Sequence, residues 1–585
     1  MRNFVQKIFA QLSLGFHALI NQQPRLSDSV ILSIFVILIT LQPFYLHGQL
    51  NIFEFGIYLG GINEILRGHL PYLDVFHLRG PLELYPPAWL MMIFGKNLSV
   101  LATYFYVCNV LSLLICVLIA KELLRTRLAL YLLIPVLVGR TFLRVVFTFW
   151  GGMRFASALL VVLGIIYCYK FRKPLWLLFC GLATAIALLI SLEMGFACAL
   201  SLLSTFLFSL IFRIQKPKTV MRHLGLCIAG GAIIILPYFL FLHFHQALMP
   251  YIHDALSVVS NMPKAIPVHF IRKNPQTFFE VIRALHPMSA DYKYMTPLFC
   301  FLFLSGYIIY RLKQNTIKEN QLGFIGLSAF GLVMYQLAFR NFESGQFEMA
   351  LQPEKILLFI MLEEIFLWVW KKWHEFFIFL KTSSAPRRIL YLKITGLSFL
   401  ILGFCASSLG YALARFNNRF ITFHYMKDFL TGGQSRNKLI PLWGENSVRL
   451  TIPTMKNIVV PAFQAQDITS VYKTIRKNTD PNEPVFFFPE LASYHFIVNR
   501  PAIGRFPMVT FSWLREDWQQ QLIDDLQNAP PRFAVIQVDP GESFPQCYFK
   551  VPRNKESYDR ILSFIHDHYE VFQTTPSLLI FRRKS

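Results

Sequence analysis

The chain has 585 residues, of which 55% are hydrophobic and only 15% charged, and its mean hydropathy is +0.46. This composition excludes an ordinary soluble globular protein. Repeated apolar segments of roughly 20 residues match the thickness of a bilayer core. The clearest of these segments are 30–44, 98–120, 175–190, 196–212, 224–242, 324–339, 356–370 and 389–413. The sequence therefore predicts a polytopic α-helical membrane protein with about 11–13 transmembrane helices.

The formal net charge of +23 would suit a nucleic-acid-binding protein, but its distribution along the chain argues against that class. The basic residues gather in short loops between apolar segments, as lysines and arginines do in cytoplasmic loops. These loops are 170–173, 213–222, 311–318, 371–372 and 381–388. We therefore expect membrane lipids, and no nucleic acid, among the partners.

The order of the apolar segments predicts three parts. Residues 1–28 form a cytoplasmic lead-in, residues 29–413 a multi-span domain with its first outer loop at 48–81, and residues 414–585 an extracytoplasmic tail. An inside N-terminus and an outside tail require an odd number of spans, whereas a direct count gives about twelve. One segment between residues 82 and 169 is therefore expected not to cross the membrane.

The sequence pattern of the tail is typical of a small α/β domain. Helices are expected at 467–477, 515–527 and 558–568, with strands at 485–488 and 533–538 and a final strand pair near 571 and 578–581. This alternation predicts a partly parallel sheet. The tail lacks a glycine-rich nucleotide loop and holds one of the nine cysteines, Cys547, so neither a disulfide framework nor a CxxC metal motif is indicated. No cofactor is indicated with certainty, and a divalent metal is left open.

A polar segment, residues 53–81, separates the first two apolar segments. A helix is expected to begin near Glu54 and end near Gly68, followed by a turn that holds Asp74. His77 and Arg79 follow in the same loop. From spacing alone, Glu54 could simply be an acid at a helix start, favoured there by the helix dipole, and Asp74 a solvated loop residue.

The sequence pattern around this loop is more specific than the spacing. An acid, a helix that ends in Leu-x-Gly, the run Pro-Tyr-x-Asp at 71–74 and Gly-Pro-Leu at 80–82 together resemble the first outer loop of C-type (GT-C) membrane glycosyltransferases. That superfamily includes protein O-mannosyltransferases and lipid A aminoarabinose transferases. Segments 181–195, 338–343 and 531–537 resemble further parts of the same enzymes.

The resemblance implies a GT-C-like fold and a donor sugar linked to polyprenyl phosphate. It implies transfer to a glycan, lipid or protein acceptor outside the cytoplasm, in a bacterial inner membrane with the tail in the periplasm. A carboxylate must take a proton from the acceptor. The match assigns this role to Glu54, with Asp74 as a second carboxylate. Many relatives carry a second acid beside the first, and here Phe55 stands there.

The same chemistry needs cations that stabilise the departing phosphate, a role that arginine suits. The expected binding residues are Arg79, Arg340, His77, Glu193 and Arg154. For several of them a structural role is the alternative. Arg340 could pair with Glu343, and Glu193 could pair with an arginine or cap the helix that follows it.

Two other functions stay open at the level of the sequence. A transporter or flippase of a lipid-linked or polar solute would show internal repeats and ionisable residues at the bilayer midplane, whereas here the acids cluster towards one face. A non-catalytic assembly factor that binds partners through its tail is the third interpretation.

Overall fold

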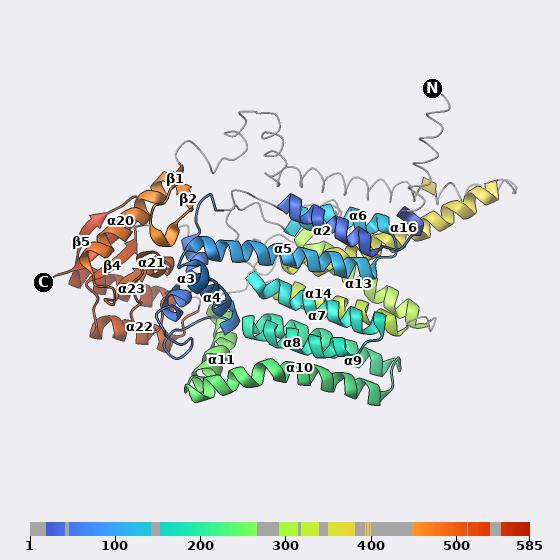
Figure 1. Ribbon diagram of the computed structural model, residues 1–585, viewed down its shortest axis with the longest axis horizontal. Coiled ribbons are helices and arrows are strands. Elements are labelled where there is room, and N and C mark those ends of the chain that lie inside the picture. The colour runs from blue at the N-terminus through green and yellow to red at the C-terminus, as the bar shows by residue number, and fades with distance from the viewer. Residues whose placement is uncertain are drawn as a thin grey trace, which may run out of the picture.

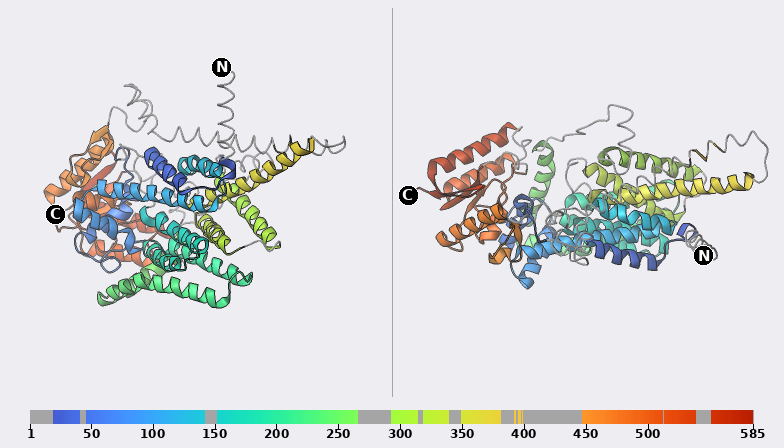
Figure 2. Two further views of the ribbon diagram at one scale, coloured as in Figure 1. Left: turned by 45° about the vertical axis from the view of Figure 1, so that its right-hand side comes forward. Right: turned by 90° about the horizontal axis from the view of Figure 1, so that it is seen from above.

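The computed structural model describes residues 19–40, 46–141, 152–265, 292–313, 318–338, 349–380, 447–511, 513–538 and 551–584, with isolated positions between 392 and 398. A bundle of long helices forms one end of the elongated molecule, and the C-terminal α/β domain forms the other (Figures 1 and 2). Segments 142–151, 266–291, 339–348, 381–391 and 399–446 lie outside the described residues, so the predicted last span is not described.

The bundle is built from apolar helices whose buried faces form one continuous core. Its members are α2 (Leu26–Thr40), α5 (Leu98–Leu123), α6 (Arg127–Thr141), α7 (Gly152–Phe171), α8 (Leu175–Ile190), α9 (Leu192–Ile211), α10 (Pro217–Phe244), α13 (Tyr292–Lys313), α14 (Leu322–Ala338) and α16 (Gln352–Leu380). In the described part of the chain, α5, α7, α9 and α10 are long and apolar enough to cross a membrane, and four shorter helices are similarly apolar. On α10, Ile228, Ile233 and Leu236 are exposed, as expected of a helix that faces lipid.

The helix α4 (Tyr85–Phe94) bears on the number of spans expected from the sequence. At 10 residues it extends about 15 Å, half of what a bilayer core requires. It lies beside α3 (Ile52–Ile65) at the end of the bundle that faces the C-terminal domain (Figure 1). This segment is therefore one that fits the expectation of a non-crossing segment between residues 82 and 169.

The two ends of the bundle differ in charge. The connections α5–α6, α7–α8 and α9–α10 carry clustered lysines and arginines and lie at the end away from the C-terminal domain (Figure 1). The first loop and the starts of α7 and α9 lie at the opposite end. This arrangement agrees with the topology expected from the distribution of basic residues.

The C-terminal domain contains the predicted helices and strands with small shifts at their ends. Its helices are α20 (Ala462–Asn478), α21 (Ser493–Val498), α22 (Glu516–Asn528) and α23 (Pro552–His568). The strands β3 (Phe486–Phe488), β4 (Phe533–Gln537), β5 (Tyr569–Thr574) and β6 (Leu578–Arg583) form a sheet of order β3-β4-β6-β5. The β3–β4 pair is parallel and the others are antiparallel, so the prediction of a partly parallel sheet is confirmed. The short α21 and the pair β1 (Ser447–Arg449) and β2 (Val459–Pro461) are not foreseen in the sequence.

The C-terminal domain packs directly on α3, and one hydrophobic core runs through both. Contact is close because α3 presents glycines: a Cβ atom built on Gly56 would lie 3.1 Å from the backbone nitrogen of Ser493 and 3.2 Å from the Cβ of Ala492. The Ser493 hydroxyl also donates to the carbonyl of Ile52, the first residue of α3. The start of α3, where Glu54 lies, is therefore positioned by the C-terminal domain.

A polar tie reinforces this contact. The ammonium group of Lys96, between α4 and α5, donates to Asn63 Oδ1 on α3 (2.7 Å) and to Asn499 Oδ1 in the C-terminal domain (2.6 Å). One partly buried cation thus joins three parts of the chain. Loss of either acceptor would leave a donor with a desolvation cost.

Candidate active site

The site begins at the first turn of α3. The side chain of Asn51 caps the helix by accepting a hydrogen bond from the Glu54 N–H (3.0 Å), and the Glu54 carboxylate is half-buried in that turn. Phe55 is fully buried, with its ring 6.3 Å from that of Phe105. Position 55 therefore faces the apolar core, which explains why a second acid does not stand beside Glu54.

The loop after α3 turns back against the bundle at Gly80. The Gly80 N–H donates to the Ile190 carbonyl at the end of α8 (3.0 Å). A Cβ atom on Gly80 would lie 2.0 Å from the carbonyl oxygen of Leu189, so only glycine fits. The short helix η1 (Pro81–Glu83) follows. This close approach carries Arg79 and Glu83 to the starts of α7 and α9.

Arg79 and Glu83 form a buried ion pair. The Arg79 guanidinium donates to Glu83 Oε1 (2.8 Å) and to the Tyr58 hydroxyl on α3 (3.1 Å), and His77 Nε2 lies 3.2 Å from Glu83 Oε2. Burial opposes the charge of Arg79, but attraction to Glu83 and Tyr58 leaves the arginine pKa above its ordinary value. Burial likewise opposes the charge of Glu83, yet Arg79 and His77 hold the glutamate pKa below its ordinary value. Both groups are therefore charged at neutral pH.

A second pair joins the starts of two bundle helices. Arg154 on α7 donates to Glu193 Oε2 on α9 (2.6 Å), so the interpretation of Glu193 as the partner of an arginine is confirmed. Arg154 is 8% exposed, and its Nε has no hydrogen-bond partner among the described residues. Arg79, Glu83 and Glu54 act electrostatically on Arg154, so the two ion pairs belong to one cluster.

The structure thus brings together most of the residues that the sequence singles out. Glu54, His77, Arg79, Arg154 and Glu193 lie in one polar cluster where the bundle meets the C-terminal domain. Within electrostatic range of Glu54 are Arg79, Tyr58 and, from the C-terminal domain, Glu490.

Asp74 and Arg340 are placed differently. Asp74 is exposed, and its carboxylate accepts a hydrogen bond from the Leu70 N–H (2.8 Å) in the turn after α3. This matches the solvated turn residue that spacing alone suggests. Among the residues that the structure describes, no contact joins Asp74 to the cluster. Arg340 and Glu343 lie outside the described residues, so the role expected for Arg340 stays a prediction.

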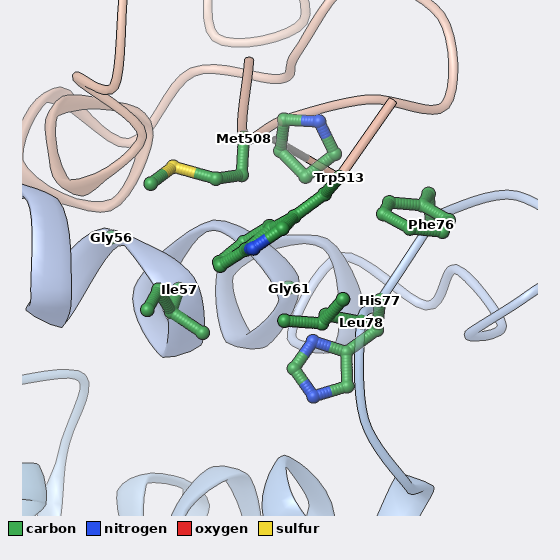
Figure 3. Close-up of a pocket in the computed structure, with 9 residues that line it drawn as sticks. Gly56, Ile57, Gly61, Phe76, His77, Leu78, Met508 and Trp513 are labelled. Atoms are coloured by element: carbon green, nitrogen blue, oxygen red, sulfur yellow. The ribbon is translucent and has the colours of Figure 1, made fainter. Parts of the chain in front are cut away.

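A small pocket adjoins the cluster (Figure 3). It is lined by Gly56, Ile57, Gly61, Phe76, His77, Leu78, Pro507, Met508 and Trp513. The Trp513 ring, from the C-terminal domain, lies over α3 in Figure 3, while Phe76, His77 and Leu78 come from the first loop. The pocket wall therefore combines α3 and the loop that follows it with a segment of the C-terminal domain more than 400 residues away, and His77 links it to Glu83.

No group of three or more His, Cys, Asp or Glu side chains arranged to hold a metal occurs among the residues that the structure describes. Cys108, Cys116, Cys168, Cys180, Cys198 and Cys227 are buried free thiols.

Three residues of the cluster are missing from the sequence prediction. Glu83 follows Arg79 by four residues, a spacing that suits a local ion pair and could have been recognised. Tyr58 lies one helical turn after Glu54, so it shares a face of α3 with it. Glu490 is more than 400 residues away, and nothing in its local sequence connects it to the loop.

The architecture is that of an apolar helical bundle capped by an α/β domain, with a buried polar cluster between them. No protein-family model and no curated protein sequence matches the chain. Among solved structures, the chain is similar in fold to ArnT from Cupriavidus metallidurans bound to undecaprenyl phosphate, with a TM-score of 0.50 and 10% identity over 94% of this chain and 97% of that one. The same enzyme in its apo state matches with a TM-score of 0.50 and 11% identity, over 94% and 96% of the two chains.

The archaeal oligosaccharyltransferase AglB from Archaeoglobus fulgidus, in complex with an inhibitory peptide and a dolichol-phosphate, matches with a TM-score of 0.48 and 11% identity, over 93% of this chain and 72% of that one. Both are C-type glycosyltransferases, and ArnT is a lipid A aminoarabinose transferase. The similarity to ArnT confirms the expected resemblance to this superfamily at the level of the fold.

Proposed function

We propose that the protein is a membrane glycosyltransferase that moves a sugar from a polyprenyl-phosphate donor to an extracytoplasmic acceptor. The observation that carries this proposal is the position of the Glu54 carboxylate, half-buried and within electrostatic range of Arg79 and the buried Arg154, at the end of the bundle that faces the C-terminal domain. The donor chemistry is taken from the fold, since the ArnT structure holds undecaprenyl phosphate.

In this mechanism Glu54 is the general base. Its carboxylate takes the proton from an acceptor hydroxyl or amine as that atom bonds to the anomeric carbon. The bond between the anomeric carbon and the phosphate oxygen breaks, and the polyprenyl phosphate leaves with the electron pair. Glu54 lies in the first turn of α3. The Asn51 side chain accepts the Glu54 N–H, and Ser493 of α21 donates to the Ile52 carbonyl in the same turn.

The arginines stabilise the charge that the leaving phosphate acquires. Arg154 has an Nε–H donor that no described residue accepts, in a buried site where a charged hydrogen bond is strong. Arg79 is oriented by Glu83 and Tyr58, which hold one of its guanidinium nitrogens. Glu83 and Glu193 are assigned as positioning residues because they bind Arg79 and Arg154, and His77 because it contacts Glu83.

The setting belongs to the same proposal. The donor reaches the site from the bilayer, and the acceptor is a glycolipid, a lipopolysaccharide or a protein outside the cytoplasm. A bacterial inner membrane with the C-terminal domain in the periplasm fits the distribution of basic loops. The polar cluster lies at one end of the bundle, whereas a transporter or flippase would place its ionisable residues near the middle.

The test uses the full-length protein in lipid nanodiscs with short-chain polyprenyl-phosphate sugars and extracted envelope glycolipids or proteins as acceptors. Glu54→Gln should lower the transfer rate by about 10²–10⁴-fold, because it removes the base and keeps the shape. Asp74→Asn is the matched control: its amide oxygen can still accept the Leu70 N–H, so most of the activity should remain.

Full activity of Glu54→Gln would refute the assignment of the base. Movement of intact donor lipid between leaflets without cleavage of its sugar–phosphate bond would favour the flippase instead.

A further inference from the structure

The C-terminal domain contributes a buried acid, Glu490, to the neighbourhood of Glu54. Glu490 follows β3 and is 6% exposed. Its φ angle is +55°, a left-handed conformation that a residue with a side chain adopts only where its surroundings hold it there. The Glu490 N–H donates to the Val509 carbonyl (3.1 Å), and the Thr510 hydroxyl donates to Glu490 Oε1 (2.7 Å). The surrounding loop therefore holds this carboxyl in one place.

The packing of α21 on α3 brings Glu490 close to the start of α3. Ala492 and Ser493, just after Glu490, contact Gly56 on α3, and the Ser493 hydroxyl binds the Ile52 carbonyl. Glu54 lies between these two contacts in the same turn. The negative charge of Glu54 consequently acts on Glu490, across a boundary between two parts of the chain that lie more than 400 residues apart.

Two carboxyl groups in such an environment do not both ionise readily, so one of them keeps its proton. The surroundings of the two carboxyl groups decide which of them keeps its proton. Glu54 is half-buried and faces the positive charges of Arg79 and Arg154, with the neutral hydroxyl of Tyr58 nearby. Glu490 is buried and has the Thr510 hydroxyl and the charge of Glu54 as its neighbours. The proton therefore belongs on Glu490, which leaves Glu54 ionised.

We propose that Glu490 is a positioning residue of the active site, supplied by the C-terminal domain, which faces Glu54 as a neutral acid and keeps the base ionised. This rests on the proposed function, because it assigns a partner to the proposed base. When Glu490 loses its proton, a second negative charge appears beside Glu54, and binding of an anionic lipid phosphate weakens.

Burial raises the pKa of Glu490 to about 8; the Thr510 hydrogen bond opposes this rise and the charge of Glu54 adds to it. The affinity for undecaprenyl phosphate should therefore fall above about pH 8 in the wild-type protein. Glu490→Gln stays neutral, so its affinity should lack this alkaline decrease, whereas Glu490→Asp should retain one. Glu516→Gln, an exposed position on α22, is the matched control and should behave as the wild type.

Infrared difference spectroscopy of the same full-length proteins tests the protonation without any need for activity. A protonated-carboxyl band should be present at neutral pH, disappear near pH 8, and be absent from Glu490→Gln but not from Glu516→Gln. In Glu54→Gln the band should disappear at a lower pH, because the neighbouring negative charge is gone.

The proposal is overturned if Glu490→Gln leaves the band unchanged, if its titration is the same in Glu54→Gln, or if lipid binding keeps its alkaline decrease. Absence of glycosyl transfer with the expected bands and binding profile would contradict the proposed function alone. The two failures are therefore distinguishable.

Discussion

Gly80→Ala tests whether the contact between the first loop and α8 positions the active site. The backbone of Gly80 has φ −72° and ψ 163°, which alanine adopts without strain. Any effect of the substitution must therefore come from steric overlap between the new methyl group and its neighbours. The new Cβ atom would lie 2.0 Å from the Leu189 carbonyl oxygen, whereas ordinary contact begins at 3.4 Å. The difference, about 1.4 Å, is the distance by which loop and helix must separate.

The cost follows from this displacement. Overpacking of about 1–3 kcal/mol adds to the loss of the hydrogen bond from Gly80 to Ile190, about 0.5–1.5 kcal/mol, so the free energy of unfolding should fall by roughly 2–4 kcal/mol. Arg79 and Glu83 move with the loop, away from Arg154. Misplacement of catalytic groups by about 1 Å can lower a rate by about 10²-fold, so transfer should fall by a similar factor.

The assays are thermal unfolding in detergent and the transfer rate at saturating donor. Gly225→Ala is the control, since its Cβ would have no atom of the described residues within 4 Å and it lies on α10, away from the site. It should leave both quantities close to wild type. If Gly80→Ala also matched the wild type in unfolding temperature and rate, the idea that this contact positions Arg79 and Glu83 would be wrong.

Three further predictions concern buried charge. Arg79→Gln leaves Glu83 without its main cation and should lower the free energy of unfolding by about 3–5 kcal/mol, measured by chemical denaturation, with Arg79→Lys less affected. Because the pKa of Glu83 is depressed in the folded protein, its stabilisation is present above the unfolded value of 4.5 and is lost as the pH falls through the folded value. The unfolding temperature should therefore fall in acid, and less steeply in Glu83→Gln. Lys96→Met removes the tie to Asn63 and Asn499, at a cost of about 1–3 kcal/mol, and limited proteolysis should release the C-terminal domain faster than from the wild type.

The local elements of this protein could be predicted because they depend on short-range pattern. In the tail, alternating apolar residues and turn signals were sufficient for α20, α22 and α23 and for the sheet strands. The end of the helix that begins near Glu54 was also predicted from a local signal, because glycine readily adopts the left-handed backbone that follows a helix. Gly68 has this conformation, with φ +94°. The sequence left open which segment between residues 82 and 169 does not cross the membrane, because the ten-residue length of α4 is visible only in the structure.

Membership of the site could be predicted only in part. Charged residues next to apolar segments are costly at membrane depth, so Arg154 and Glu193 stand out in the sequence. That they pair, and that Arg79 acts on the same cluster, depends on the approach of Gly80 to α8. Asp74 fits the sequence pattern equally well, and in the structure its carboxylate accepts the Leu70 N–H in the turn after α3.

The sequence by itself determined the helical membrane class and the placement of the basic loops, because hydrophobic length and charge placement act locally along the chain. The choice of Glu54 as the acid of the first loop rests on the resemblance to C-type glycosyltransferases. Only the tertiary structure decided which charges meet. Glu54 gains its neighbours from the return of the loop at Gly80 and from the docking of α21 against α3. Side chains such as Glu490 become part of the site through packing between residues far apart in sequence, and no local pattern records that packing.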